Sequence, residues 1–325
     1  MESVTKNQRF QKQSLNAFNR KKLYIYYIKL YDLYLLFMPY DNIKQAKQAI
    51  QDCNAILIIA GAGMSVDSGI FTYRGTNGIW ENSIQIGNEL YRYDEISSLN
   101  MWNKYPELAW GFKSNFYKMI QDHEPHEGYY TLLNHIQKKL HNNYFICTSN
   151  IDNYFERAGF DSKKIYEVHG TMKYLQCMDK KCSIRNGIIE AQPITIPPFD
   201  PKTFIAYNMP KCPHCKNILR PNVSMFGDYN FYGKLYEHAR KRMEIWLNEV
   251  NKNDQKLLIL EIGCGINPHS LRMNNGIMLS GEWKLPKINN LQFSIRLNPE
   301  ENLEDTKNNT IHINMGAKLG LKSIL

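Results

Sequence analysis

Four of the seven cysteines stand in two close pairs, Cys177 with Cys182 and Cys212 with Cys215. Four thiolates at these spacings can close a tetrahedral shell around zinc. Such a shell has no open position for water, so we expect a structural metal. The surrounding segment is loop-rich and holds little apolar material, which disfavours the alternative of four unrelated core cysteines. His214 lies inside the second pair, but four thiolates already complete the shell.

A second stretch with chemical potential is a glycine turn. The apolar run 55–59 leads into it, and its residues are Ala60, Gly61, Ala62 and Gly63. The run is typical of a buried parallel strand, and the glycines let the backbone approach a ligand closely. A helix beginning near Ser65 would direct free N–H groups and a positive dipole end at that ligand, which suits a pyrophosphate. The same glycines are also compatible with a turn that needs them for geometry alone.

Polar side chains follow two further predicted strands. Asn150 and Asp152 come directly after the run 144–148, and His169 follows the run 165–168. Polar groups at such positions commonly meet a ligand. Histidine titrates near neutrality, so His169 can accept a proton at physiological pH. Asp152 is equally suited to capping the turn that precedes Phe155.

The elements that position these residues alternate between strands and helices. The predicted strands cover 55–60, 144–148, 165–168, 257–262, 291–297 and 310–314. Apolar residues at helical spacing predict helices with buried faces Ile43/Ala46/Ala49/Ile50/Cys53, Leu108/Phe112/Phe116/Met119 and Tyr130/Leu133/His135/Ile136/Leu140. This alternation indicates a doubly wound, Rossmann-like parallel α/β sheet. Ligands bind beyond the carboxyl ends of the strands in such sheets, where the glycine turn, Asn150 and His169 all fall.

The chain divides into three regions. Residues 41–170 and 218–325 are predicted to form the Rossmann-like domain, with a mostly helical insertion over about 76–142. Residues 171–217 lack the alternating pattern and carry the paired cysteines and several prolines, so we expect a separate small zinc-binding module. Residues 1–40 form an N-terminal extension that is basic at first and then aromatic and apolar.

Much of the net charge of +9 lies at the N-terminus, because residues 1–30 hold seven basic side chains and one acid. A solvated basic arm accounts for this pattern, so we expect no direct nucleic-acid binding by the folded body of the chain. The apolar stretch 23–39 is marginal in length and contains Lys29 and Asp32, which argues against a membrane span. Close cysteine pairs favour an intracellular, reducing compartment, cytoplasm or nucleus, with organelle targeting by the extension as an alternative. We expect a monomer.

Several motifs occur in a fixed order along the chain. They are the glycine turn, Phe71-Thr72-Tyr73-Arg74-Gly75, Thr148-Ser149-Asn150-Ile151-Asp152, Val168-His169-Gly170 and the two cysteine pairs. With these motifs the chain resembles, from about Asp41 to its C-terminus, the sirtuin (Sir2-like) family of NAD-dependent protein deacylases. The resemblance implies an enzyme that uses NAD, carries zinc and acts on an acylated protein or peptide.

The resemblance also implies a role for individual residues. His169 would be the general base, and Asn150 would orient the nicotinamide ribose and a water. Asp152 would meet the nicotinamide carboxamide, Arg74 would face phosphate or ribose, and Tyr73 would screen the reacting carbon. The further implied cofactor contacts are Ala60, Gly61, Ala62, Gly63, Ser149, Ile151, Gly263, Cys264, Gly265, Asn298 and Ala317. An extended peptide substrate would add to the strand that contains Val223, Met225, Phe226 and Gly227.

The chain departs from the family pattern at three places. The usual Gly-Ile-Pro-Asp-Phe-Arg reads Gly69-Ile70-Phe71-Thr72-Tyr73-Arg74, and the usual Thr-Gln-Asn reads Thr148-Ser149-Asn150. Cys264 stands where serine or threonine is common. Arg74, Asn150, Asp152 and His169 are all present, so we expect the mechanism to be retained, with slow turnover.

We therefore predict an NAD-dependent protein-lysine deacylase (deacetylase) that releases nicotinamide and acyl-ADP-ribose. The alternatives are a mono-ADP-ribosyltransferase or NAD glycohydrolase on the same scaffold, and a catalytically weak NAD-binding sensor. Lys113 and Phe116 fall where sirtuins that prefer acidic acyl groups carry a tyrosine and an arginine. Phe116 cannot bind a carboxylate, and Lys113 is expected to be free to point to solvent, so we predict a preference for neutral acyl groups.

Overall fold

The computed structural model describes residues 41–70, 84–86, 88–182, 189–190, 196–265, 273–274, 277–278, 288–299 and 310–325. The extension 1–40 and two implied cofactor contacts, Tyr73 and Arg74, lie outside these ranges. The chain divides into two compact units, residues 1–45 and 46–325, and the elements below belong to the second. Its helical residues 46–52 bury Ala46, Ala49 and Ile50, and Cys53 is buried directly after them, as the apolar spacing predicted.

A six-stranded sheet forms the centre of the second unit. Its spatial order is β13 (Thr310–Ile313), β12 (Leu291–Leu297), β9 (Leu257–Ile262), β1 (Ala55–Ala60), β4 (Tyr144–Thr148) and β5 (Ile165–Glu167). Every neighbouring pair is parallel, which confirms the predicted doubly wound α/β fold. The strand order reverses between β1 and β9, and sheets of this class bind ligands at such a reversal.

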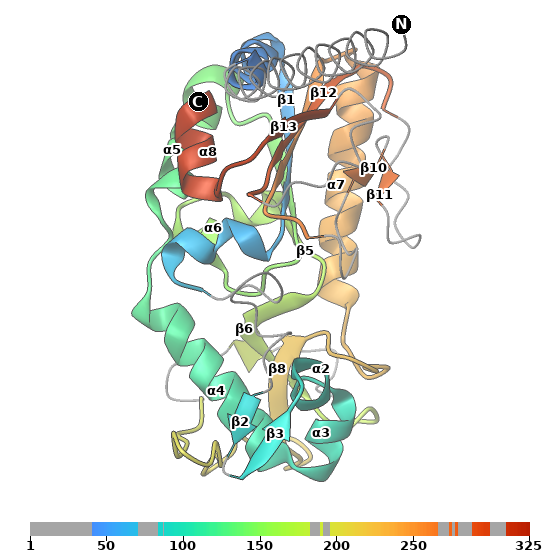
Figure 1. Cartoon of the computed structure of the whole chain (residues 1–325). Helices are drawn as coiled ribbons and strands as arrows, with labels where there is room; N and C mark the ends of the chain where they lie inside the picture. Colours follow the sequence, from blue (N-terminus) through green and yellow to red (C-terminus); the bar gives the residue numbers. More distant parts are fainter. Residues whose placement is uncertain are drawn as a thin grey trace, which may run out of the picture. The chain divides into compact units, whose positions relative to one another are not determined.

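Helices cover both faces of this sheet (Figure 1). On one face, α7 (Lys234–Lys252) packs Met243 and Leu247 against Leu57 and Ile59 of β1. On the other face lie α5 (Glu127–Leu140) and α8 (Ala317–Ile324), which contact each other. All six residues of β1 are buried because both faces are covered, which explains the uninterrupted apolar run in the sequence.

The α5 helix is confirmed, but its buried stripe differs from the prediction. The residues that face the core are Tyr129, Leu132, Ile136 and Leu140, whereas Tyr130 is 46% exposed. These residues lie four, four and three positions apart when counted back from Leu140. The observed buried stripe therefore also has helical spacing and was compatible with the sequence pattern. The large aromatic side chain at 130 misdirected the prediction by one position.

Among the described residues between β1 and β4, a short hairpin and three helices precede α5. The hairpin pairs β2 (Ile84–Ile86) with β3 (Glu89–Tyr91), and the helices are α2 (Tyr93–Ile96), α3 (Leu99–Lys104) and α4 (Pro106–Asp122). The helix expected around 108–119 is therefore present as α4. Short elements elsewhere are α6 (Tyr154–Arg157), η3 (Ser162–Lys164), β10 (Met273–Asn274) and β11 (Ile277–Met278).

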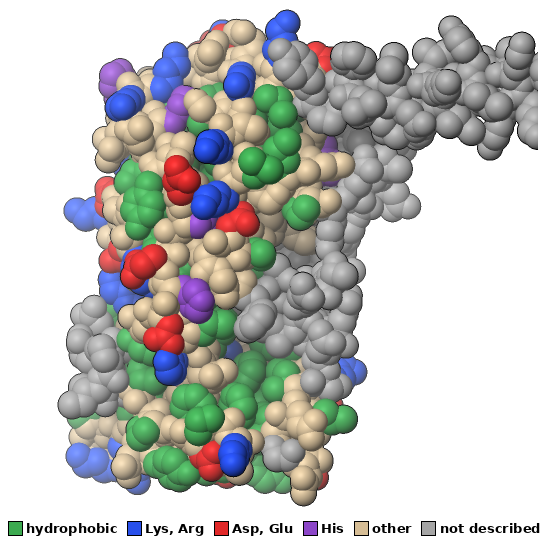
Figure 2. Space-filling view, turned by 60° about the vertical axis from the view of Figure 1, so that its left-hand side comes forward, with side chains coloured by type: hydrophobic (Ala, Val, Ile, Leu, Met, Phe, Trp, Pro, Cys, Tyr) green, Lys and Arg blue, Asp and Glu red, His purple; other side chains and the backbone are tan. Residues whose placement is uncertain are grey.

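The cysteine-bearing segment contributes to a second, antiparallel sheet with the order β7-β6-β8. Its strands are β7 (Ile189–Glu190), β6 (Gly170–Cys177) and β8 (Leu219–Val223). This sheet shares a hydrophobic core with α2, α3 and α4, so the apolar material that the local sequence lacks comes from the insertion. The Trp110 indole N–H donates to the Leu219 carbonyl oxygen at 2.8 Å. Figure 2 shows apolar side chains gathered over the lower part of the displayed face, where these elements lie.

Close backbone packing also fixes α4 against the cysteine-bearing segment. A Cβ placed at Gly111 would lie 1.7 Å from the Phe204 carbonyl oxygen, so only glycine allows this approach. Within the described residues, no helix is both long and apolar enough to cross a membrane.

Candidate functional site

The carboxyl ends of four adjacent strands bring several predicted residues together. Ser149 N–H donates to the Ala60 carbonyl at 3.1 Å, which joins the ends of β4 and β1. Gly61 N–H donates to the Ile262 carbonyl at 2.9 Å, which joins β1 to β9. Gly263 N–H donates to the Leu297 carbonyl at 2.8 Å at the end of β12. The turns after β1, β4 and β9 therefore meet at one edge of the sheet, as parallel packing predicted.

The two glycine turns contact each other directly. Gly63 N–H donates to the Gly263 carbonyl at 3.0 Å, and a Cβ on Gly61 would lie 2.6 Å from the Gly263 carbonyl oxygen. Gly263 itself has a φ of 60°. These glycines are thus required by the contact between two turns, which is the geometric alternative that the sequence left open. The N–H groups of Gly61, Gly63 and Gly263 are used in these contacts, so a bound phosphate would have to meet other groups of the two turns.

The helix expected near Ser65 is replaced by two 3₁₀ turns, η1 (Ala62–Met64) and η2 (Val66–Ser68). Gly69 ends the second turn with a φ of 87°. The expectation of an α-helix dipole directed at the ligand from this position is therefore wrong for residues 62–69. Phosphate binding by this turn would rest on its remaining backbone N–H groups, because those of Gly61, Gly63, Met64 and Ser65 donate to carbonyls within the protein.

Ser65 is the centre of a buried hydrogen-bond network. Its Oγ donates to Asp152 Oδ2 at 2.6 Å and accepts from Asn150 Nδ2 at 3.0 Å. The Tyr129 hydroxyl lies 3.1 Å from the same oxygen. All four side chains are buried. Sequence reasoning identified Asn150 and Asp152 but missed Ser65 and Tyr129 as members of the site.

Asp152 has two structural roles in this network. Its Oδ1 accepts from the Tyr154 N–H at 2.9 Å, which is the cap that the sequence suggested as an alternative, and its Oδ2 binds Ser65. Burial raises the pKa of Asp152, and these hydrogen bonds oppose the shift. Both readings of Asp152 are therefore compatible, because each carboxylate oxygen keeps a second lone pair for a ligand.

The neighbouring backbone is fixed by equally specific contacts. Asn150 N–H donates to Thr148 Oγ1 at 3.1 Å, and the Thr148 hydroxyl donates to the Ala60 carbonyl at 3.0 Å. The Ile151 carbonyl accepts from Met172 N–H at 3.1 Å, which links this loop to β6. These bonds hold Asn150 rigidly between the ends of β1 and β6.

His169 lies between the end of β5 and the start of β6. The imidazole is half-buried, burial lowers its pKa, and no described residue hydrogen-bonds to the ring. Its carbonyl accepts from Ser224 N–H at 2.8 Å. Gly170 follows with a φ of 80°, and a Cβ there would lie 2.2 Å from the Asn222 carbonyl oxygen. The backbone on both sides is thus fixed, and the neutral ring is able to accept a proton.

The remaining predicted cofactor contacts follow β9, β12 and β13, and they differ in burial and in hydrogen bonding. Asn298 is buried and donates from Nδ2 to the Cys264 carbonyl at 3.1 Å. The Cys264 side chain packs in the core beneath β1 and α7, whereas Gly265 is exposed. Ala317 is buried in the first turn of α8, whose Lys318 N–H donates to Asp67 Oδ2 at 2.8 Å. Asp67 therefore already caps this helix.

The predicted peptide-binding strand is partly paired within the chain. Phe226 N–H donates to the Ser97 carbonyl at 3.1 Å, and Leu99 N–H donates to the Phe226 carbonyl at 3.0 Å. Val223 pairs with Gly170 in the β6–β8 ladder, Met225 is buried and Phe226 is 37% exposed. The backbone edge at Phe226 is thus taken by residues 97–99. The neighbouring Met225 and Gly227 carbonyls already accept from the N–H groups of Asp228 and Tyr229, each at 3.1 Å.

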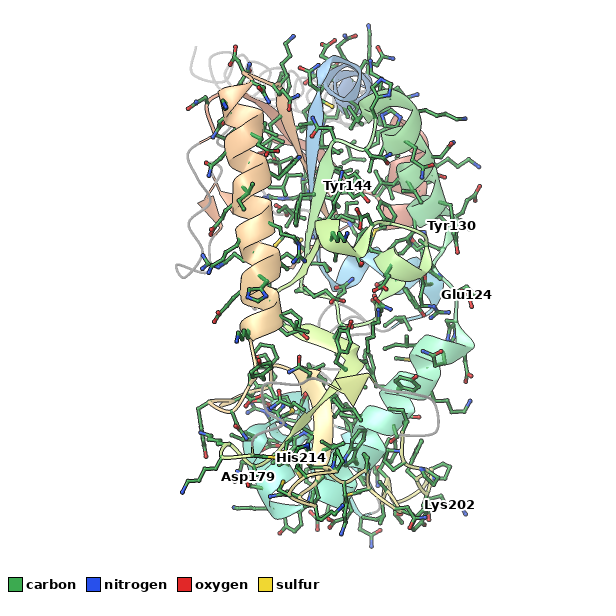
Figure 3. The ribbon with its side chains drawn as sticks, turned by 180° about the vertical axis from the view of Figure 1, so that it is seen from behind. Glu124, Tyr130, Tyr144, Asp179, Lys202 and His214 are labelled. Carbon is green, nitrogen blue, oxygen red and sulfur yellow. The ribbon has the colours of Figure 1, made fainter. Side chains whose placement is uncertain are left out.

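The four predicted zinc ligands converge. The sulfur atoms of Cys177, Cys182, Cys212 and Cys215 lie within 4.8 Å of one another. The Cys177–Cys215 and Cys182–Cys212 sulfur distances are 3.5 and 3.6 Å. Tetrahedral zinc with sulfur at about 2.3 Å requires sulfur separations of about 3.8 Å, so the cluster fits the metal. His214, labelled in Figure 3, is not one of the four clustered ligands.

Lys113 does not point to solvent, contrary to the expectation from its flexible stem. It is 2% exposed, and its Nζ donates to Ser97 Oγ at 2.9 Å. Burial, and secondarily the charge of Arg220, lower the pKa of Lys113 to about 8. Phe116, the other residue predicted at the acyl pocket, is half-buried on the same helix.

A groove of about 430 Å³ lies between α4 and residues 196–201, and it contains none of the predicted site residues. Tyr117, Pro198 and Phe199 contribute to its walls. It does not bear on the strand-end site.

Glycine turns and buried polar groups at the reversal point of a parallel sheet are typical of nucleotide-binding α/β proteins. The model of the Sir2 family matches residues 61–248. The chain belongs to the Sir2 family.

Curated relatives agree with this assignment. The chain is 29% identical over 249 residues to the NAD-dependent protein deacylase of Leptospira interrogans (strain Fiocruz L1-130), covering 72% of this chain and 89% of the relative. It is 31% identical over 189 residues to that of Aquifex aeolicus, covering 57% of this chain and 68% of the relative. The match to the Thermococcus sibiricus deacylase has 29% identity over 57% of this chain and spans 65% of the relative's length.

Solved structures share the fold. A Sir2 homologue in complex with ADP-ribose has a TM-score of 0.60 at 20% identity, covering 86% of this chain and 94% of the homologue. A Sir2 homologue in complex with NAD has a TM-score of 0.58 at 21% identity, covering 86% and 92%.

Proposed function

We propose that the protein is an NAD-dependent protein-lysine deacylase that releases nicotinamide and acyl-ADP-ribose. The observation that carries this proposal is the position of Asn150 and Asp152 at the carboxyl end of β4, bonded through Ser65 to the turn that follows β1, with His169 after the adjacent strand β5. Membership of the Sir2 family and relatives named NAD-dependent protein deacylases support it.

The residues present fit NAD. The glycine turns meet at the point where four strands end, and Asn150 and Asp152 keep hydrogen-bonding capacity beyond their internal bonds. NAD supplies the ribose carbon that loses nicotinamide and receives the acyl oxygen. Residues 60–63 and 263–265 would bind its phosphates and ribose, and Asp152 would accept from its carboxamide. Arg74, Tyr73, Ser149, Ile151, Asn298 and Ala317 remain proposed contacts.

The chain's own residues contribute orientation and proton transfer. Asn150, fixed through Ser65 and Thr148, would hold the nicotinamide ribose in one orientation. His169 is kept neutral by its partial burial, so it would accept the proton of a ribose hydroxyl at neutral pH. Residues 223–227 would position the acyl-lysine beside that ring, because Ser224 N–H bonds to the His169 carbonyl.

A protein substrate is supported by a fold neighbour, a Sir2 protein in complex with a deacetylated p53 peptide and 3'-O-acetyl-ADP-ribose, with a TM-score of 0.59 at 18% identity. It covers 87% of this chain and 96% of that neighbour. We further propose an intracellular location, cytoplasm or nucleus, and a monomeric state. The division into a Rossmann-like domain, residues 41–170 and 218–325, and a zinc module, residues 171–217, also stays a proposal.

The decisive experiment incubates the purified full chain with NAD and one peptide in two forms, acetylated and unmodified on the same lysine. Nicotinamide release that requires the acetylated form supports the deacylase. Equal release with either peptide, or without peptide, would favour an NAD glycohydrolase, and ADP-ribose attached to the peptide would favour a mono-ADP-ribosyltransferase. Binding of NAD without any release would favour a sensor and contradict the proposal.

A further inference from the structure

The first turn of α5 is attached to the glycine turn that follows β1. His126 precedes this helix, and its Nδ1 accepts from Gly128 N–H at 2.9 Å. Its Nε2 therefore carries the ring proton and donates to the Met64 carbonyl at 2.9 Å. His126 N–H also donates to Ser68 Oγ at 2.9 Å. These bonds attach the start of α5 to Met64 and Ser68, which lie on either side of Ser65 in the sequence.

One residue of this turn reaches the centre of the site. Tyr129 is completely buried, and its ring packs edge-on against Phe155 with centroids 4.9 Å apart and beside His126 at the same separation. Rigid packing on two sides leaves the hydroxyl little freedom. It lies 3.1 Å from Ser65 Oγ.

The other hydrogen bonds of Ser65 determine which hydroxyl donates in its contact with Tyr129. A serine hydroxyl has one proton to donate and two lone pairs to accept with. The Ser65 proton is given to the Asp152 carboxylate at 2.6 Å, and one lone pair accepts from Asn150 Nδ2. The Tyr129 hydroxyl therefore donates to the remaining lone pair. Ser65 is saturated by three protein partners, so it cannot bind a ligand without losing one of them.

We propose that Tyr129 is a positioning residue of the nicotinamide pocket. The hydrogen bond from its hydroxyl is the third bond of Ser65 Oγ. It keeps the Ser65 hydroxyl donating to Asp152 Oδ2 and the Asn150 amide in one orientation. The open lone pairs of Asp152 and the amide oxygen of Asn150 are thus directed in advance toward the carboxamide and ribose. This inference rests on the proposed function, because it assigns the nicotinamide end of NAD to Asp152.

The test compares Tyr129→Phe with Tyr130→Phe, since Tyr130 is the exposed neighbour on the same helix (Figure 3). Tyr129→Phe should raise the nicotinamide concentration that half-inhibits peptide-dependent NAD cleavage by about fivefold, the factor that one neutral hydrogen bond contributes. Its Kd for ADP-ribose, which keeps the ribose assigned to Asn150 but lacks the carboxamide assigned to Asp152, should change less and stay within about twofold of wild type by calorimetry, because Asn150 is also held through Thr148. Tyr130→Phe should match wild type in both measurements.

Unchanged nicotinamide inhibition in Tyr129→Phe would overturn the positioning role and leave the deacylase proposal intact. An equal weakening of ADP-ribose binding would indicate general damage to the fold, which would also overturn it. A wild-type protein that shows no peptide-dependent NAD cleavage would overturn both proposals.

Discussion

Lys113 is a cation buried in the core shared by α4 and the cysteine-bearing segment, so its charge should cost stability. Its Nζ donates to Ser97 Oγ at 2.9 Å, and that partner is neutral. The folded-state pKa of about 8 lies below the usual lysine value of 10.5. That difference corresponds to roughly 3 kcal/mol of unfavourable burial for the charged form.

The sign of the pH dependence follows from this depressed pKa. Below about pH 8, lysine is protonated in both folded and unfolded chains, and the full cost is present. Between about pH 8 and 10.5 the folded protein releases the proton first, so stability rises with pH. Roughly 2 kcal/mol of the cost should be relieved by pH 9.5.

Lys113→Met replaces the cation with an apolar side chain of similar length. The gain from removing the charge is opposed by the lost bond to Ser97, which leaves about 1–2 kcal/mol of net stabilisation at pH 7. We expect the Tm to rise by about 2–5 °C at pH 7 and this advantage to shrink or vanish by pH 9.5. Thermal unfolding of both proteins over this pH range measures the effect.

The control is Lys118→Met, since Lys118 lies on the same helix, is mostly exposed and pairs with Asp122. Its Tm difference from wild type should be small and independent of pH. Destabilisation of Lys113→Met at pH 7, or a Tm difference that does not change with pH, would refute the reasoning about the buried charge.

Two further predictions concern the metal and the acyl group. Metal analysis should find about one zinc per folded chain, and chelation should unfold residues 171–217 and abolish activity, because metal binding and folding are coupled; folded, active protein with less than half an equivalent would contradict this. Neutral acyl-lysines should exceed succinyl-lysine by at least about tenfold in kcat/KM, roughly 1.4 kcal/mol, because Phe116 offers no donor and Lys113 Nζ is bonded to Ser97. Acetyl, myristoyl and succinyl forms of one peptide test this, and succinyl as the best substrate would show that the pocket is misread.

The parallel sheet was predictable from the sequence because its strands are covered on both faces. Their residues form continuous apolar runs, and the bounds of β4, β9 and β12 match the prediction. The four zinc ligands were predictable for a related reason, since their chemistry requires a local spacing that survives in the sequence. Both signals are local, and neither depends on how distant segments pack.

Features that depend on tertiary contacts were not predictable in the same way. Nothing near Lys113 in the chain shows that Ser97 and the core of the cysteine-bearing segment enclose it. Tyr129 meets Ser65 only because α5 packs across the end of β1. The 3₁₀ turn that contains Gly63 contacts the second glycine turn, which lies about two hundred residues further along the chain.

The central claim is that His169 acts as the general base of an NAD-dependent deacylation. Mass spectrometry of the products from an acetylated peptide and NAD tests it most directly, in wild type and His169→Ala. We expect wild type to form one acetyl-ADP-ribose for each nicotinamide released. His169→Ala should form it about two to four orders of magnitude more slowly, with ADP-ribose affinity little changed. Near-normal acetyl-ADP-ribose formation by His169→Ala, or nicotinamide release by wild type without that product, would contradict the account.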